Sequence, residues 1–299
     1  MKRYLYCGTY DDSASSGIYR ITFEDGILSD PQRIAALASA KYLAEDGDKI
    51  ISIITENGKA GIAVLDRQGR RENTLLYEDI ASCYVTADEG HIYSANYHEG
   101  TMSVIRKDEA GLQLERRIKL ADKAGCHQIL LKDGLIWLIA LFLDKIFIFD
   151  KNYQIIREIG FPKGTGPRHA VFSKDGKYLY VLSELSNELF TLNTQNYQII
   201  SSTALVHKGA PAAIRLSDEN IFISVRKADE IAVYGLDNGI PVFRKIMSCG
   251  GRHPRDMITV DGYCICANLD SDEVSCVNEK GIISKVEIPK AVSIICESN

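Results

Sequence analysis

Short runs of apolar, β-branched and aromatic residues alternate with tight-turn sequences along the chain, and the alternation recurs at a nearly constant interval. Turn sequences such as EDG, KDG and DEN end at Gly47, Gly90, Gly134, Gly176, Asn220 and Gly262. Successive turns are 43, 44, 42, 44 and 42 residues apart. Asp-Gly-type pairs supply the positive φ of a tight hairpin, so each turn predicts two antiparallel strands. A hairpin at this spacing is typical of the blades of a β-propeller.

Each turn is followed by two clear strand-like runs and a weaker third one. The runs directly after the turns are 50–55, 91–96, 135–141, 177–183, 221–225 and 263–268. The next runs are 61–66, 103–108, 145–150, 188–193, 230–237 and 273–278, and weaker outer runs include 74–80, 158–161 and 202–206. No helical pattern of ten or more residues separates these runs, which disfavours a parallel α/β sheet. The pattern therefore predicts an all-β fold with four strands in each repeat.

The two ends of the chain complete the last repeat. The N-terminal region begins with a second and a third strand, at 3–10 and 17–23, with no first strand before them. The apolar run from Ala291 to Cys296 can supply the strand that is missing. We therefore predict one domain over residues 1–299, a seven-bladed β-propeller whose N- and C-terminal strands share a blade and remove the free sheet edges.

Composition and charge exclude several classes of protein. Hydrophobic residues make up 45% and charged residues 25% of the chain, as in a soluble folded protein. A net charge of −5 argues against nucleic acids or anionic membranes as partners. The first residues lack the apolar run of a signal peptide, and the longest apolar stretch, 135–143, is too short to cross a bilayer as a helix. We expect a cytoplasmic protein.

Cysteine spacing gives no indication of a metal or redox site. The eight cysteines are scattered along the repeats without a CxxC pair. We expect most of them to be reduced and buried, and we expect neither a cofactor nor a bound metal. A divalent-cation site would need several Asp, Glu or Asn oxygens that point toward the axis of the ring. Glu184 is one such acid, but arginines are expected near it, and their positive charge would oppose a bound cation.

Polar and charged residues collect at one end of the predicted blades. The start of a first strand and the end of the second strand lie at the same face of a propeller, because one hairpin joins the two antiparallel strands. That face is where a ligand commonly binds in the central channel. The residues at such positions that we select as candidates are His127, Arg168, His169, Glu184, Arg226, Arg255, Asn96 and Asn268.

One segment carries a family resemblance. GTGPRHAVFSKDGKYLYVLSELSN, at 164–187, resembles the most characteristic stretch of the seven-bladed lactonase family, which includes bacterial 6-phosphogluconolactonases and fungal carboxymuconate cycloisomerases. ANYHEGTMSV at 95–104, GCHQILL at 125–131 and PRDMITVDGYCICANLDSDEVS at 254–275 support it, in order along nearly the whole chain. The resemblance implies that His127, Arg168, Glu184 and Arg226 take the places of the catalytic residues of the cycloisomerase branch. The chain departs from the family at Ala213, where an acidic residue is common, and at Gly125, where a second His is common.

The chemistry of these residue types agrees with lactone opening, which needs a water activated by a base and a stabilised oxyanion. His127 or Glu184 could be the base. Arg168 and Arg226 stay protonated and suit a carboxylate, a phosphate or the oxyanion. Arginines beside Glu184 should lower the pKa of its carboxyl, so proton transfer falls to His127, with Glu184 orienting the histidine or the water.

We therefore expect a metal-independent lactone hydrolase of the 6-phosphogluconolactonase type, acting on a small anionic lactone in carbohydrate metabolism, as in the pentose phosphate pathway. Arg255, His169, Asn96 and Asn268 are expected to contact the substrate. Two alternatives stay open: a cycloisomerase or hydrolase of another lactone, and a non-catalytic propeller that binds a small anion or a protein. In the second case the charges at the channel would be binding groups only. Separately, Arg168 and Glu184 could form a structural ion pair between strands of one blade, which would not exclude a functional role.

Overall fold

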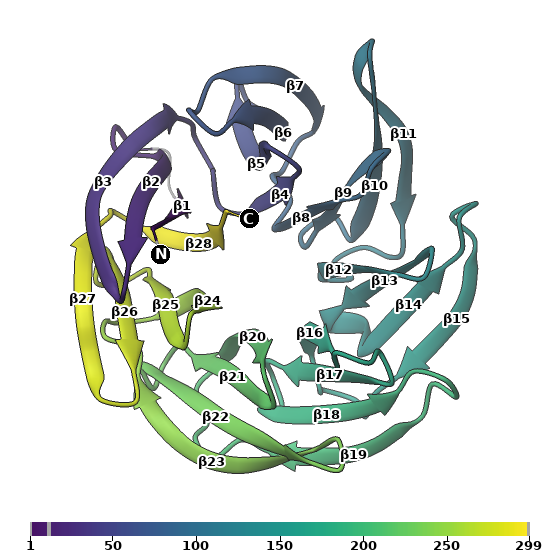
Figure 1. Cartoon of the computed structure of the whole chain (residues 1–299). Helices are drawn as coiled ribbons and strands as arrows, with labels where there is room; N and C mark the ends of the chain where they lie inside the picture. The colour runs from purple at the N-terminus through teal and green to yellow at the C-terminus, as the bar shows by residue number, and fades with distance from the viewer. Residues whose placement is uncertain (1, 11–12, 298–299) are drawn as a thin grey trace.

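Seven sheets stand in a ring around a central channel (Figure 1). The computed structural model describes residues 2–10 and 13–297, and in these residues each sheet has four antiparallel strands. We number the sheets as blades 1 to 7 along the chain. The predicted seven-bladed propeller is confirmed.

The strands, named from the channel outward, are as follows. Blade 1 contains β28 (Ala291–Cys296), β1 (Arg3–Thr9), β2 (Gly17–Glu24) and β3 (Ile27–Ala36), and blade 2 contains β4 (Leu43–Asp46), β5 (Lys49–Glu56), β6 (Lys59–Asp66) and β7 (Arg71–Glu78). Blade 3 contains β8 (Tyr84–Ala87), β9 (His91–Asn96), β10 (Thr101–Asp108) and β11 (Gly111–Lys119), and blade 4 contains β12 (Cys126–Lys132), β13 (Leu135–Ala140), β14 (Lys145–Phe149) and β15 (Ile155–Gly160), with a 3₁₀ turn at Leu141–Leu143. Blade 5 contains β16 (Pro167–Phe172), β17 (Tyr178–Ser183), β18 (Glu188–Asn193) and β19 (Ile199–Ala204). Blade 6 contains β20 (Pro211–Ser217), β21 (Asn220–Val225), β22 (Glu230–Asp237) and β23 (Ile240–Ser248), and blade 7 contains β24 (Pro254–Val260), β25 (Tyr263–Asn268), β26 (Glu273–Asn278) and β27 (Gly281–Glu287).

The second and third strands of a blade are hydrophobic on both faces because a neighbouring blade covers each face. In β13, five of the six residues of LIWLIA are buried. Trp137 and Ile139 of this strand belong to a core cluster that includes Leu179 and Val181 of β17 in the next blade. Burial of one large aliphatic side chain stabilises the fold by about 1.5–3 kcal/mol. The core is therefore a ring of interfaces between blades.

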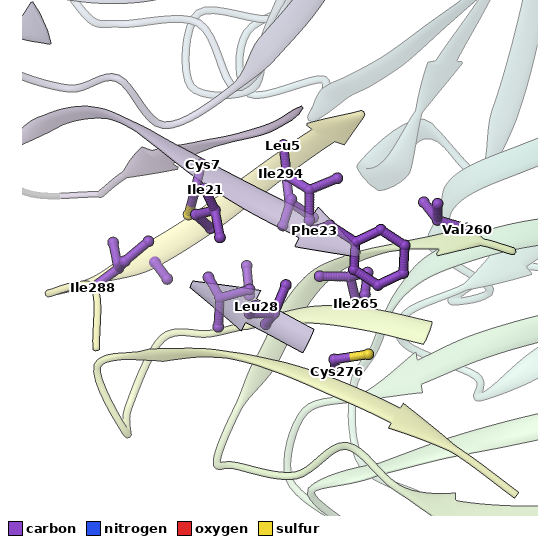
Figure 2. Packing of buried hydrophobic residues seen from close by; sticks show 13 residues of the cluster. Leu5, Cys7, Ile21, Phe23, Leu28, Val260, Ile265, Cys276, Ile288 and Ile294 are labelled. Atoms are coloured by element: carbon purple, nitrogen blue, oxygen red, sulfur yellow. The ribbon is translucent and has the colours of Figure 1, made fainter. Parts of the chain in front are cut away.

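The ring closes between the two ends of the described chain. Strand β28 pairs antiparallel with β1 in a register that places Leu5 opposite Cys296. Leu5 and Phe23 of blade 1 lie in one buried cluster with Ile294 of β28 and with Ile265 of blade 7 (Figure 2). The predicted closing strand is confirmed, and the cluster joins the first blade to the last.

The predicted hairpins connect the first two strands of a blade, although their backbone geometry varies. Four of the six have positive φ at the expected position: Gly47, Gly134, Gly176 and Gly262. At 88–90 the carboxylate of Asp88 accepts hydrogen bonds from the N–H groups of Gly90 and His91, and no left-handed residue is needed. At 218–220 the left-handed residue is Asp218, with φ of 52°, and not Asn220.

Strand pairing places the start of each first strand beside the end of the second strand. Pro167 is opposite Ser183 in blade 5, and Pro211 is opposite Val225 in blade 6. Residues next to these pairs, including Arg168, therefore lie at one end of the channel. No helix in the described part of the chain is long and apolar enough to span a membrane.

Candidate active site

A cavity of about 230 Å³ lies at this end of the channel. Side chains from all seven blades line it, so it sits on the axis of the ring. The lining residues are Tyr10, Lys41, Tyr42, Cys83, Tyr97, His98, His127, Arg168, His169, Glu184, Arg226, Arg255, Asp256 and Val292. Six of the eight predicted site residues are among them.

Glu184 holds two arginines at the wall of the cavity. Its Oε2 atom lies 2.8 Å from Nε of Arg168 and 2.9 Å from Nη2 of Arg226. Arg168 also donates a hydrogen bond to the carbonyl of Ala212, and Nε of Arg226 donates to the carbonyl of Ala210 at 2.7 Å. Arg168 and Arg226 are both buried. The two contacts with Glu184 lack hydrogen-bond geometry, so one N–H donor of each arginine has no aligned acceptor.

The charges of this trio set the state of the carboxylate. Burial raises the pKa of Glu184, but the positive charges of Arg168 and Arg226 outweigh burial and hold the pKa below its ordinary value. Glu184 is therefore ionised at neutral pH and is a weak base, as the sequence analysis expects.

Two buried histidines lie beside the trio. The rings of His127 and His169 meet edge to face with centroids 4.9 Å apart, and His127 also contacts the ring of Tyr97. Among the described residues, Nδ1 of His127 and both ring nitrogens of His169 have no hydrogen-bond partner. Burial lowers the pKa of both histidines well below the usual value, and the charge of Arg168 lowers it further. Both imidazoles are therefore neutral at pH 7, and each keeps a ring-nitrogen lone pair that can accept a hydrogen bond.

Two further cations face the same cavity. Arg255 comes from β24 of blade 7, and Lys41 precedes β4 of blade 2. Nζ of Lys41 donates a hydrogen bond to the carbonyl of Ala81 at 3.0 Å. Neither cation has a carboxylate oxygen within 4 Å in the described part of the chain. Sequence reasoning missed Lys41, although its place just before a first strand is the same signal that singled out Arg168.

Asp256 also lines the cavity, but its carboxylate is fully engaged. Oδ1 accepts hydrogen bonds from Arg215 at 2.6 Å and from the N–H of Met257 at 2.9 Å. Oδ2 accepts one from the N–H of Ile294 at 3.1 Å. Asp256 thus links blades 6, 7 and 1, and it does not offset the charge of the other cavity cations.

Asn96 and Asn268 do not line the cavity. The amide of Asn96 donates to Glu78 at 3.0 Å and to the carbonyl of Ile80 at 2.6 Å. The amide of Asn268 donates to Oγ of Ser275 at 2.8 Å. These amides stabilise the ends of second strands, and we do not include them in the proposed site below.

Cysteines and potential metal ligands add little to the cavity. All eight cysteines are free thiols, and only Cys83 lines it. Burial raises the pKa of Cys83, so its thiol is protonated at neutral pH. Within residues 2–10 and 13–297, no three His, Cys, Asp or Glu side chains are grouped to hold a metal ion.

Comparison with known proteins identifies the family. Residues 4–287 match the family described as "Lactonase, 7-bladed beta-propeller". The chain belongs to this family of seven-bladed β-propeller lactonases.

Named relatives agree with the assignment. The 6-phosphogluconolactonase of Bacillus subtilis strain 168 is 27% identical over an alignment of 314 positions, and the alignment covers 91% of this chain and 90% of the relative. A solved structure of a protein from Lactobacillus plantarum is 26% identical and superposes with a TM-score of 0.91 over 100% of both chains. The periplasmic gluconolactonase of Pseudomonas aeruginosa, at 18% identity, shares the fold with a TM-score of 0.88 over 100% of this chain and 99% of its own.

Proposed function

We propose that this protein hydrolyses a small anionic sugar lactone, with 6-phosphogluconolactone as the substrate. The observation that carries the proposal is the convergence of a neutral buried histidine, His127, with arginines fixed by Glu184 around one cavity. Family membership and the name of the Bacillus subtilis relative support the choice of reaction and substrate.

Each group has a defined task in the proposed reaction. His127 accepts a proton from a water molecule while the water oxygen attacks the carbonyl carbon of the lactone. Negative charge develops on the carbonyl oxygen, where Arg168 and Arg226 stabilise it. Each guanidinium group carries five N–H donors, and Glu184 together with one backbone carbonyl takes only part of them. Glu184 keeps the two guanidinium groups in position, so their reorganisation costs little.

The tetrahedral intermediate then collapses. The carbonyl forms again, and the bond between the carbonyl carbon and the ring oxygen breaks. The imidazolium of His127 returns its proton to the departing ring oxygen, which becomes a hydroxyl group. The acid that is formed ionises at neutral pH and releases one proton, so turnover can be followed as acid production.

Metal independence and a cytoplasmic location are part of the proposal. The electrophilic groups at the cavity are guanidinium ions, which do for the oxyanion what a Lewis acid would do, and the surrounding positive charge disfavours a bound cation. Eight free thiols agree with a reducing compartment.

The test is acid release on addition of freshly dissolved lactone, with spontaneous opening subtracted. We expect turnover of 6-phosphogluconolactone that persists in the presence of a chelator. Turnover confined to a muconolactone would favour the alternative reaction, because the four core residues resemble those of the cycloisomerase branch. Loss of turnover with the chelator would contradict metal independence.

A further inference from the structure

Positive charge is distributed unequally around the cavity. Arg168 and Arg226 share the carboxylate of Glu184, whereas Lys41 and Arg255 have no carboxylate oxygen within 4 Å among the described residues. The remaining acid at the wall, Asp256, is committed to Arg215 and to backbone N–H groups. Lys41 and Arg255 are therefore the cavity cations that form no direct salt bridge in the described part of the chain.

Closure of the ring determines where these two cations lie. Lys41 belongs to blade 2 and Arg255 to blade 7, so they flank blade 1, whose strand β28 packs beside both β4 and β24. His127 and Arg168 come from blades 4 and 5, across the axis. One side of the cavity thus carries His127 and Arg168, and the other carries Lys41 and Arg255.

The side that carries Lys41 and Arg255 is built into the protein and is not part of the freely solvated surface. Hydrogen bonding to the carbonyl of Ala81 fixes the head of Lys41, which leaves two ammonium protons for a ligand. Burial lowers the pKa of Lys41, and the nearby charge of Arg255 lowers it further. Holding two like charges near each other with little solvent is unfavourable, and a bound dianion removes that cost.

We propose that Lys41 and Arg255 form the subsite for the phosphate of a phosphorylated sugar lactone, and so set the orientation of the substrate. This inference rests on the proposed function. Arg255 can bind two phosphate oxygens with its planar fork, and Lys41 contributes a point charge. With the phosphate held between blades 7 and 2, the lactone carbonyl reaches toward His127 and Arg168.

A second basic region near the mouth is the competing location. An adjoining groove is lined by Lys208 and Lys227 and shares Glu184 and Arg226 with the cavity. Both lysines are exposed, so solvent and salt screen their charges. The observations favour the half-buried pair of Lys41 and Arg255, and the variants below separate the two locations.

The kinetic test compares kcat/KM for 6-phosphogluconolactone with that for unphosphorylated gluconolactone. In Lys41→Gln and in Arg255→Gln the ratio of the two values should fall at least about tenfold, because only the phosphorylated lactone loses a contact. Lys208→Gln and Arg252→Gln are the matched controls, since they remove the same charges from exposed positions, and they should keep the ratio. An unchanged ratio in the first pair, or a fall only in Lys208→Gln, would overturn the proposal.

Product binding tests the subsite without turnover. Calorimetry should show 6-phosphogluconate bound at least about tenfold more weakly by Lys41→Gln and Arg255→Gln, with a much smaller effect on gluconate. Thermal melts identify any variant that has simply lost its fold. If the wild type binds the phosphorylated acid through these residues but opens neither lactone, the proposed function fails and the subsite stands. If the wild type opens the lactones but the variants bind both acids as the wild type does, the subsite fails alone.

Discussion

The carboxylate of Glu184 lies 2.9 Å from the guanidinium group of Arg226, across the boundary between blades 5 and 6. From the sequence, the loop that holds Arg226 has no evident acidic neighbour for it before Asp229. In the structure, Asp229 accepts a hydrogen bond from the N–H of His253 instead. The partner of Arg226 comes from the preceding blade, which also supplies Arg168 to the same carboxylate. The site is therefore assembled from several blades, and its geometry depends on their packing.

Replacing Glu184 by Gln should destabilise the protein as well as impair activity. The change leaves Arg168 and Arg226 buried without a counter-charge, which costs about 3 kcal/mol, the lower end for a broken buried pair. Urea unfolding measures the loss. Glu158→Gln is the control, because Glu158 pairs with Lys145 at an exposed site and should contribute less than about 1 kcal/mol. Equal stabilities of the two variants would contradict the role given to Glu184.

Activity should persist below the ordinary titration range of histidine. His127 must be neutral to act as a base, and burial together with Arg168 keeps its pKa well below the usual value. The acid limb of kcat/KM should therefore lie well below about pH 6.5. In Arg168→Met the limb should move to higher pH, because one repelling charge is gone. A wild-type limb at about pH 6.5, unaffected by Arg168→Met, would contradict this assignment of the base.

Acid should weaken the fold through the same histidines. His127 and His169 have lowered pKa values in the folded state, so the unfolded chain binds more protons once the pH falls below about 6.5. Above that pH the two neutral histidines do not lower the free energy of unfolding. As the pH falls toward their folded-state pKa values, the free energy of unfolding decreases by up to about 1.4 kcal/mol per pH unit for each histidine. His169→Phe should reduce the slope of unfolding free energy against pH by about that amount. An unchanged slope would show that His169 is already charged in the folded protein.

Removing the closing strand should affect the whole molecule. Deletion of residues 291–299 eliminates β28 and exposes the edge of β1, so the cooperative thermal transition should be lost. A milder test is Ile294→Ala, which should cost about 2–4 kcal/mol because Ile294 is buried between blades 1 and 7. Ile282→Ala, at an exposed position in blade 7, is the control. A deletion variant that melts like the full chain would contradict the closure.

Most of the fold could be predicted because its signals are local. The turns at Gly134 and Gly262 each join two strands that are adjacent in sequence, so the repeat could be counted without tertiary information. The exact backbone conformation of a turn could not be predicted. In the turn at 88–90, hydrogen bonds to the carboxylate of Asp88 stabilise the hairpin, and no residue has the positive φ that the turn sequence predicts.

Site residues could be predicted where a residue at the channel end of a first or second strand also belongs to a segment that resembles the lactonase family. Arg168 and Glu184 occupy such positions, and they meet in one cavity. Asn96 occupies the same kind of position, but its amide turns to Glu78, a choice of rotamer that sequence does not reveal. The pairing of Lys41 with Arg255 could not be predicted, because ring closure brings together residues that are more than two hundred positions apart.

The most direct test of the account is the loss of 6-phosphogluconolactone opening in His127→Ala, measured as acid release with the spontaneous rate subtracted. We predict clear turnover by the wild type and a fall in kcat of about a hundredfold or more in the variant, as expected for loss of a general base. Arg168→Ala should lower kcat and raise KM together, because its charge acts on both the bound anion and the transition state. Wild-type rates equal to the spontaneous rate on 6-phosphogluconolactone, gluconolactone and a muconolactone would contradict the enzymatic account and favour an anion-binding propeller.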